Sequence, residues 1–454
     1  MKRRHEIDMT SGPLLGKIFA FALPLLTTNI LQLLYNAADT VIIGQFDGSA
    51  ALAAVGSTAA LINLVTNVMI GLATGTSVIV AQHKGAGEDA DVSRTVHTSI
   101  LLSILGGILV SVIGECVSRP MLVMMGTPEH LLADALLYVR IYFAGIPFMM
   151  LVNFGASILR AVGDTRRPLY FLSISGLLNV RLNLLFVVVF DMGVSGVAVA
   201  TVISQAVAAL LITLSLCHAD GSYRLIFRQL HIYGDKLIEI LKIGLPAGIQ
   251  GSLFSISNVI IQSSINSFGQ VAMAAHTAAV SLEGFMNAAV NSVADAATSF
   301  VGQNVGAGKP KRVKKVTLVC SVANIVISVV MGTVIMIFAR QLLGIYNKEP
   351  EVIELGLNRL YVIGATYFTF GLMQVFAASL RGMGHSLSPM IISILGICGL
   401  RILYIYTVFP LVPTLMGLYI SYPASWLAAW LGNMVWYFII SRKMLAQHDK
   451  AAAA

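Results

Sequence analysis

One aspartate stands inside a long apolar segment near the start of the chain. Residues 35–44 read YNAADTVIIG, so that Asp39 has Asn36 three residues before it. A carboxylate in apolar surroundings is stable when it is paired with a cation or protonated, because an unpaired buried charge costs several kcal/mol or more. The chemistry expected of Asp39 is therefore reversible binding of a proton or a cation.

A second polar group stands in another apolar segment. Asn179 and Asn183 are four residues apart, which places them on one face of a helix, and Arg181 lies between them. Arg181 leaves two alternatives open for Asp39: exchange of a coupling ion, or a permanent ion pair with Arg181. Arg401 stands 220 residues after Arg181, again in an apolar segment. For both arginines, a structural role and contact with a substrate stay open.

The second half of the chain carries its own candidates. Glu283 and Asp295 are twelve residues apart in one apolar segment. Cation binding and packing against Asn287, Asn291 or Arg401 are both open for them. Further candidates share a polar side chain in or beside an apolar segment. They are Asn258, which stands 222 residues after Asn36, and Gln82. Gln82 is expected to brace a turn more than to contact a substrate.

The composition decides which elements position these residues. Of 454 residues, 57% are hydrophobic and 11% are charged, whereas a soluble domain carries about 25% charged residues. The apolar residues come in windows long enough to cross a bilayer as helices. The sequence therefore predicts an all-α polytopic membrane protein. Its net charge of +8 is attributed to loops that set the topology, so we expect no nucleic acid partner.

Twelve spans are predicted. Their ranges are 14–44, 50–82, 93–117, 134–158, 168–190, 193–217, 237–267, 272–303, 314–343, 352–380, 387–410 and 415–442. Of the 29 lysines and arginines, 22 fall on the side of the N-terminus, among them Lys2, Arg3 and Arg4. An excess of positive charge marks cytoplasmic loops, so both termini are predicted to be cytoplasmic, with the protein in the plasma membrane.

The two halves of the chain repeat each other. ALP at 22–24 matches GLP at 244–246, which pairs Pro24 with Pro246 at an offset of 222. AQHKGAG at 81–87 matches GQNVGAG at 302–308, and ASILRAVGDTRRP at 156–168 matches ASLRGMGHSLSP at 378–389. The unit is six spans, so the two copies share an orientation. The predicted domains are an N-lobe at 1–217, a linker at 218–236, a C-lobe at 237–445 and a tail at 446–454.

These features together resemble the multidrug and toxic compound extrusion (MATE) transporters of prokaryotes. The resemblance rests on ADTVIIGQF in the first span, the paired Gln-x-x-Gly-Ala-Gly turns and the paired Leu-Arg-x-x-Gly turns. It implies two pseudo-symmetric six-helix bundles. It also implies antiport, in which cationic or amphipathic organic compounds leave in exchange for H⁺ or Na⁺. The family's ion site maps onto Asp39, Asn179 and Asn183, with Asn36 beside them. Many relatives have an aspartate where this chain has Asn183.

The resemblance and the prolines suggest how the lobes move. Pro24 and Pro246 bend equivalent spans, since proline removes a helical hydrogen bond, and both are predicted to act as hinges. We expect a monomer without a cofactor or a resident metal; Na⁺ at Asp39 would be a coupling ion. A nucleotide loop is excluded at 306–310, because Pro310 follows Lys309 where the motif needs Ser or Thr.

The same residues bear on rival functions. Arg181 and Arg401 keep open a flippase for lipid-linked oligosaccharides, which belongs to the same superfamily. No nucleophile–base pair or metal cluster of an enzyme is assignable, so we predict that the protein is not an enzyme. The substrate, the choice between H⁺ and Na⁺, and a second ion site in the C-lobe stay open.

Overall fold

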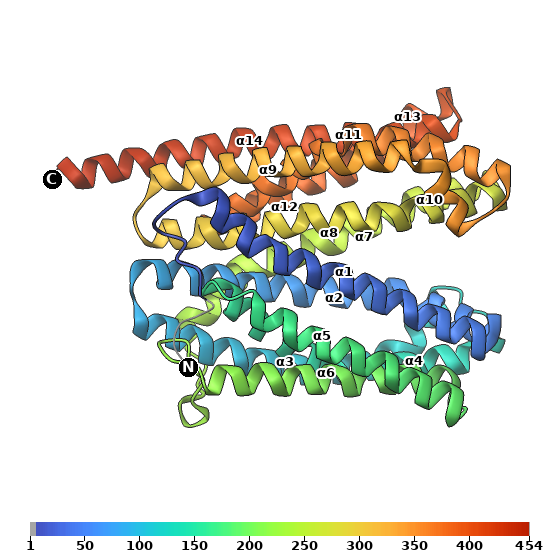
Figure 1. Cartoon of the computed structure of the whole chain (residues 1–454), viewed down its shortest axis with the longest axis horizontal. Helices are drawn as coiled ribbons and strands as arrows, with labels where there is room; N and C mark the ends of the chain where they lie inside the picture. The colour runs from blue at the N-terminus through green and yellow to red at the C-terminus, as the bar shows by residue number, and fades with distance from the viewer. Residues whose placement is uncertain (1–5, 454) are drawn as a thin grey trace. The chain divides into compact units, whose positions relative to one another are not determined.

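A computed structural model of the chain describes residues 6–453, without the side chains at 49, 52 and 451–453. Lys2, Arg3 and Arg4, which entered the prediction of topology, lie outside the described residues. Within 6–453 the chain is helical and contains no β-strand. Figure 1 labels the helices along the chain. The long apolar runs form helices because a helix satisfies every backbone polar group internally, as a bilayer requires.

The first half of the chain forms the six predicted helices. They are α1 (Leu14–Phe46), α2 (Gly48–Ala86), α3 (Asp89–Met124), α4 (Glu129–Ala161), α5 (Arg166–Asn183) and α6 (Gly193–Cys217). The fifth predicted span continues beyond α5 as a π-helical turn, η1 (Leu184–Val189). Most helices extend past their predicted ends, since a helix continues into the polar loop beyond the apolar stretch.

The second half starts after a short 3-10 turn, η2 (Phe227–Gln229). Its elements are α7 (Gly234–Asn266), α8 (Gln270–Gly306), α9 (Pro310–Ile337), α10 (Ala339–Tyr346), α11 (Pro350–Gly382), α12 (Leu387–Ser393), η3 (Ile394–Gly399), α13 (Leu400–Thr407), η4 (Phe409–Leu411) and α14 (Leu415–Ala453).

Two further predicted helices are interrupted. The span predicted at 314–343 breaks at Phe338, between α9 and α10. The span predicted at 387–410 contains the π turn η3, in which Gly396 lies against Ala429 of α14; a Cβ on Gly396 would be 3.1 Å from the backbone nitrogen of Ala429. Hydropathy does not detect such breaks, because the apolar run continues through them.

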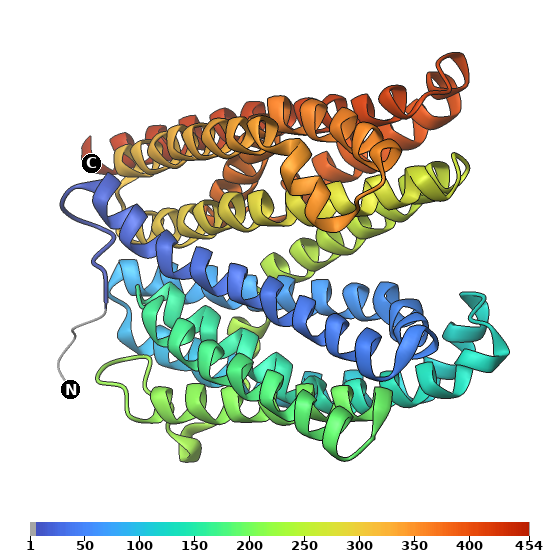
Figure 2. The same cartoon turned by 45° about the vertical axis from the view of Figure 1, so that its right-hand side comes forward.

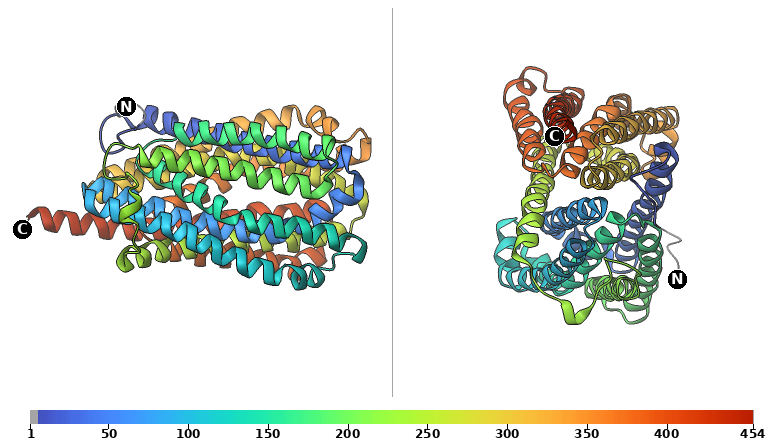
Figure 3. Two further views of the ribbon diagram at one scale, coloured as in Figure 1. Left: turned by 90° about the horizontal axis from the view of Figure 1, so that it is seen from below. Right: turned by 90° about the vertical axis from the view of Figure 1, so that its left-hand side faces the viewer.

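Ten helices of the described chain are long and apolar enough to cross a membrane. The two remaining long helices are α8 and α14, with 37 and 39 residues. The last turns of α14 project beyond its neighbours α9 and α11, as the left view of Figure 3 shows for the C-terminal end.

The helices pack into two compact units. Of the described residues, the first unit holds 6–8 and 27–248, and the second holds 9–26 and 249–453. In the first, α4 contacts α2, α3 and α6; in the second, α11 contacts α8, α9 and α14. Figure 2 shows each set from a second direction. Because α4 and α11 are equivalent spans of the repeat, the two units have the same packing plan, each around its own copy of this helix.

The start of α7 belongs to the first unit because glycines let it approach α2. A Cβ on Gly71 would lie 2.1 Å from the backbone nitrogen of Gly248, and one on Gly75 would lie 2.4 Å from the carbonyl oxygen of Ile240. Small residues at a helix crossing permit such backbone contact. The start of α1 packs within the second unit instead, where the rings of Phe21 and Phe300 are 5.6 Å apart. The predicted lobe limits stay a prediction.

Candidate functional site

The first unit brings Asp39 of α1 together with Asn183, the last residue of α5. The Nδ2 of Asn183 donates a hydrogen bond of 2.5 Å to Oδ1 of Asp39. Asn183 is fully buried and Asp39 is partly buried. The amide therefore holds the carboxylate at a fixed place in the unit.

The polar contacts continue along α5 and onto α6. Nδ2 of Asn183 also lies 3.3 Å from Oδ1 of Asn179, and Nδ2 of Asn179 donates to Oγ1 of Thr201 at 3.3 Å. The Oδ1 of Asn183 is buried and has no hydrogen-bond partner. An unused buried acceptor beside a carboxylate is the kind of oxygen that a hard cation binds. The predicted set of Asp39, Asn179 and Asn183 is thus brought together.

A glycine on α5 explains how the two helices come this close. A Cβ on Gly176 would lie 1.8 Å from the ring of Tyr35 of α1, so the ring occupies the space that a side chain would need. Gly176, Asn179 and Asn183 follow one another at spacings of three and four residues, on the same helical face. The face that accepts Tyr35 therefore also presents the two amides to α1.

Apolar side chains surround this polar group. Ile42, Ile43, Val187, Val194 and Val197 form a buried cluster with contributions from α1, η1 and α6. Val187 belongs to the π turn η1, which begins directly after Asn183. Such turns are frequent at functional sites, and nothing in the apolar sequence LLFVVV signals one.

Asn36 and Arg181 take no part in this contact network. Both are exposed, and the side chain of Arg181 leaves α5 about 200° around the helix from its asparagine neighbours. Among the ion pairs of residues 6–453, none joins Arg181 to Asp39. The alternative of a permanent pair between them, left open by the sequence, is not what the structure has.

The second unit contains a buried ion pair instead. Nε and Nη2 of Arg359 on α11 donate to Oε1 and Oε2 of Glu283 on α8, at 2.6 and 2.8 Å. Nη1 of Arg359 lies 3.3 Å from Nδ1 of His276. The sequence predicted Asn287, Asn291 or Arg401 as neighbours of Glu283, and it did not predict Arg359. The position of Arg359, one of few basic residues inside a span, could have indicated this pair.

Arg401 of α13 lies in the same cluster. It is 1% exposed. Its Nε donates to Ser425 at 3.0 Å, and its Nη1 donates to Asn258 at 2.9 Å. The ring of Tyr422 lies 4.4 Å from the guanidinium carbon of Arg401 and 4.6 Å from that of Arg359. Asn258 is therefore a hydrogen-bond acceptor of Arg401. From the sequence, the two residues were separate candidates.

The other predicted residues stand apart from both groups. Asp295 of α8 is exposed and within electrostatic reach of Arg381. Gln82 is half-buried near the end of α2. Pro24 and Pro246 lie inside α1 and α7 and are half-buried.

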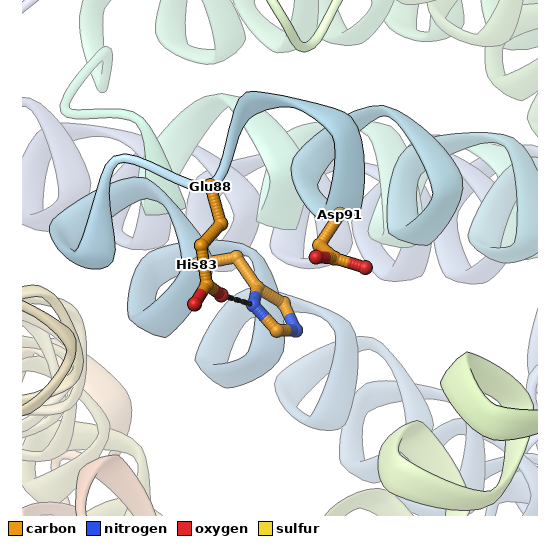
Figure 4. A group of neighbouring side chains, drawn as sticks. All are labelled: His83, Glu88 and Asp91. Atoms are coloured by element: carbon orange, nitrogen blue, oxygen red, sulfur yellow. Dashed lines mark hydrogen bonds and ion pairs between the residues drawn. The ribbon is translucent and has the colours of Figure 1, made fainter.

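A further polar cluster lies at the α2–α3 turn, where Figure 4 draws His83, Glu88 and Asp91. Nδ1 of His83 is 2.6 Å from Oε2 of Glu88, and Asp91 lies on the same side of the turn. By type and distance these three residues could hold a metal ion. The ammonium of Lys236, however, lies 3.0 Å from Nε2 of His83 and 3.2 Å from Oδ1 of Asp91. The ammonium thus provides the positive charge that a metal ion would bring to these residues. It also links α7 to the turn.

Known proteins resemble this chain over most of its length. The family model MatE matches twice, at residues 24–185 and 246–407, which confirms the internal repeat. A probable multidrug resistance protein, YoeA of Bacillus subtilis, is 29% identical over 93% of both chains. An FAD transporter of Shewanella oneidensis is 25% identical over 87% of both. Neither description supports the flippase alternative.

Solved structures match along the same length. The outward-facing conformation of a multidrug resistance MATE family transporter covers 98% of this chain and 100% of its own, with a TM-score of 0.91 and 22% identity. This likeness confirms the predicted fold, twelve membrane helices in two six-helix bundles.

Proposed function

Because the chain belongs to the MatE family, whose model matches both of its halves, we propose that it is a secondary active antiporter. It exports cationic or amphipathic organic compounds in exchange for H⁺ or Na⁺, with no cofactor and as a monomer. The description of YoeA as a probable multidrug resistance protein supports this substrate class. Its proposed location is the plasma membrane, and the bias of lysines and arginines supports cytoplasmic termini.

The observation that carries the coupling is the contact of Asp39 with Asn183 inside an apolar cluster. A carboxylate there is stabilised either by a proton or by a cation, and the two exclude each other. The unused Oδ1 of Asn183 and the Oδ1 of Asn179 offer further oxygens to a sodium ion. Ion binding and ion release at Asp39 thus supply two states of the first unit.

The prolines offer a way to turn these states into movement. Pro24 precedes Leu26, the last residue of α1 that packs within the second unit, and Pro246 precedes Gly248, the last residue of α7 that packs within the first. Each proline therefore lies within two residues of the point at which its helix is divided between the units. A change in the bend of α1 alters the path of the segment that carries Asp39.

Transport in proteoliposomes tests the proposal. Wild-type protein should move a fluorescent organic cation when a pH or Na⁺ gradient is imposed, and Asp39→Asn should abolish the response to the gradient. Asp134→Asn is the matched control, because Asp134 is an exposed acid on α4. Normal gradient-driven transport by Asp39→Asn under both gradients would refute the coupling role of Asp39.

A further inference from the structure

The cluster around Tyr422 carries one more positive charge than negative charge. Arg359 and Arg401 are both buried there, at 2% and 1% exposure. Glu283 is the carboxylate of the cluster, and Arg359 takes both of its oxygens. Among the residues that the structure describes, the hydrogen bonds of Arg401 go to neutral side chains. The charge of Arg401 is thus left without a carboxylate.

The guanidinium of Arg401 also has an unused donor. Its Nε and Nη1 are satisfied by Ser425, Ser257 and Asn258, whereas its Nη2 is buried without a hydrogen-bond partner. Leaving a buried charged donor unpaired is costly, because the group has lost its water and gained no acceptor. The rings of Tyr422 and Phe254, 4.4 and 5.5 Å from the guanidinium carbon, offset part of that cost.

Two neighbouring side chains also have buried polar atoms without hydrogen-bond partners. The hydroxyl of Tyr419 and the Nε1 of Trp426 are buried without partners. Tyr419 lies beneath Arg359, with 5.3 Å from its ring centre to the guanidinium carbon, and the Trp426 ring is 5.8 Å from that of Tyr422. An indole nitrogen donates and does not accept. The cluster therefore has spare donors and spare positive charge, and what it lacks is a negatively charged acceptor.

We propose that this cluster binds one small anionic group, with Nη2 of Arg401 as its main donor. The group is a halide ion or the carboxylate or phosphate of a carried molecule, since all three accept hydrogen bonds from a guanidinium. A water molecule could satisfy the donors, but it would leave the charge uncompensated. This site lies in the second unit and is distinct from the cation chemistry proposed at Asp39.

The tryptophans make the proposal measurable. All three of the chain, Trp426, Trp430 and Trp436, lie on α14. In a Trp430→Phe/Trp436→Phe background, Trp426 is the single reporter and belongs to the cluster. Purified protein in detergent is titrated with bromide, which quenches indole fluorescence on contact, and the ionic strength is held constant with isethionate, a sulfonate. We expect saturable quenching that chloride reverses.

Substitutions separate the site from general quenching. Arg401→Gln should raise the half-saturating bromide concentration by at least about tenfold, because it removes a charged hydrogen bond. Arg401→Lys keeps the charge and should retain part of the affinity. Arg340→Gln is the control, since Arg340 is an exposed arginine of the same unit that pairs with Glu354; it should bind bromide like the parent.

Competition identifies the source of the anion. Displacement of bromide by acetate or methyl phosphate supports the charged group of an organic molecule, and displacement by halides alone supports an inorganic ion. Quenching of the parent that rises linearly without saturation would overturn the proposal, as would unchanged binding by a folded Arg401→Gln variant. If Arg401→Gln does not fold, the parent and Arg401→Lys titrations decide the matter.

Discussion

Replacing Glu283 by Gln should destabilise the second unit strongly, because it breaks a buried ion pair. The substitution keeps the shape of the side chain but leaves the guanidinium of Arg359, 2% exposed, without its carboxylate. Two charged hydrogen bonds of 2.6 and 2.8 Å are lost, each worth about 1.5–3 kcal/mol. The cost of breaking a buried pair is about 3–5 kcal/mol, so the two figures agree.

The double variant Glu283→Leu/Arg359→Met should recover most of that loss. Removing both charges also removes their desolvation cost, and apolar replacement of a buried pair is often neutral or stabilising. The assay is reversible unfolding in mixed micelles, followed by tryptophan fluorescence from α14. If Arg401 holds an anion nearby, Glu283→Gln should also make stability more dependent on chloride.

The matched control is the ion pair between Arg340 and Glu354, whose side chains are 64% and 56% exposed. Glu354→Gln should change the free energy of unfolding by less than about 1 kcal/mol, as is usual for exposed pairs. A loss for Glu283→Gln as small as that of Glu354→Gln would show that Arg359 does not depend on Glu283, and the reasoning would fail.

Three further outcomes are expected. Pro24→Ala should lower the rate of transport without changing the binding of Na⁺ or H⁺, and unchanged transport would exclude a hinge there. Gly176→Val should impair transport by pushing α5 away from the ring of Tyr35, whereas Gly16→Val, with open space around its Cα, should not. Burial raises the pKa of Tyr223, as does its hydrogen bond to Glu6; the stability that this gives is present below about pH 10 and falls at higher pH, and Tyr223→Phe should remove that fall in a pH series of melting curves.

Much of the candidate site was predictable from the sequence. Asp39 stood out because an acid in an apolar segment is costly, and Asn179 and Asn183 because their spacing places them on one helical face. In the structure Asn183 donates to Asp39, and Asn179 joins the group through Asn183; their role in ion coupling stays a prediction. The outward direction of Arg181 follows from the same spacing, because a residue two positions from each asparagine points about 200° around the helix from them. What the sequence did not show is which face of α5 meets α1.

The sequence by itself determined the number of spans, the twofold repeat of a six-span unit and the family, because apolar length and a constant offset are properties of the chain alone. Tertiary structure decided the partners. Glu283 meets Arg359 from 76 residues away, and Arg401 meets Asn258 from 143 residues away. Such pairs depend on how helices rotate and cross, which in the second unit involves close contacts such as that of Gly396 with Ala429. Hydropathy does not report those contacts. The excess of buried positive charge in the second unit could therefore be recognised only from the folded chain.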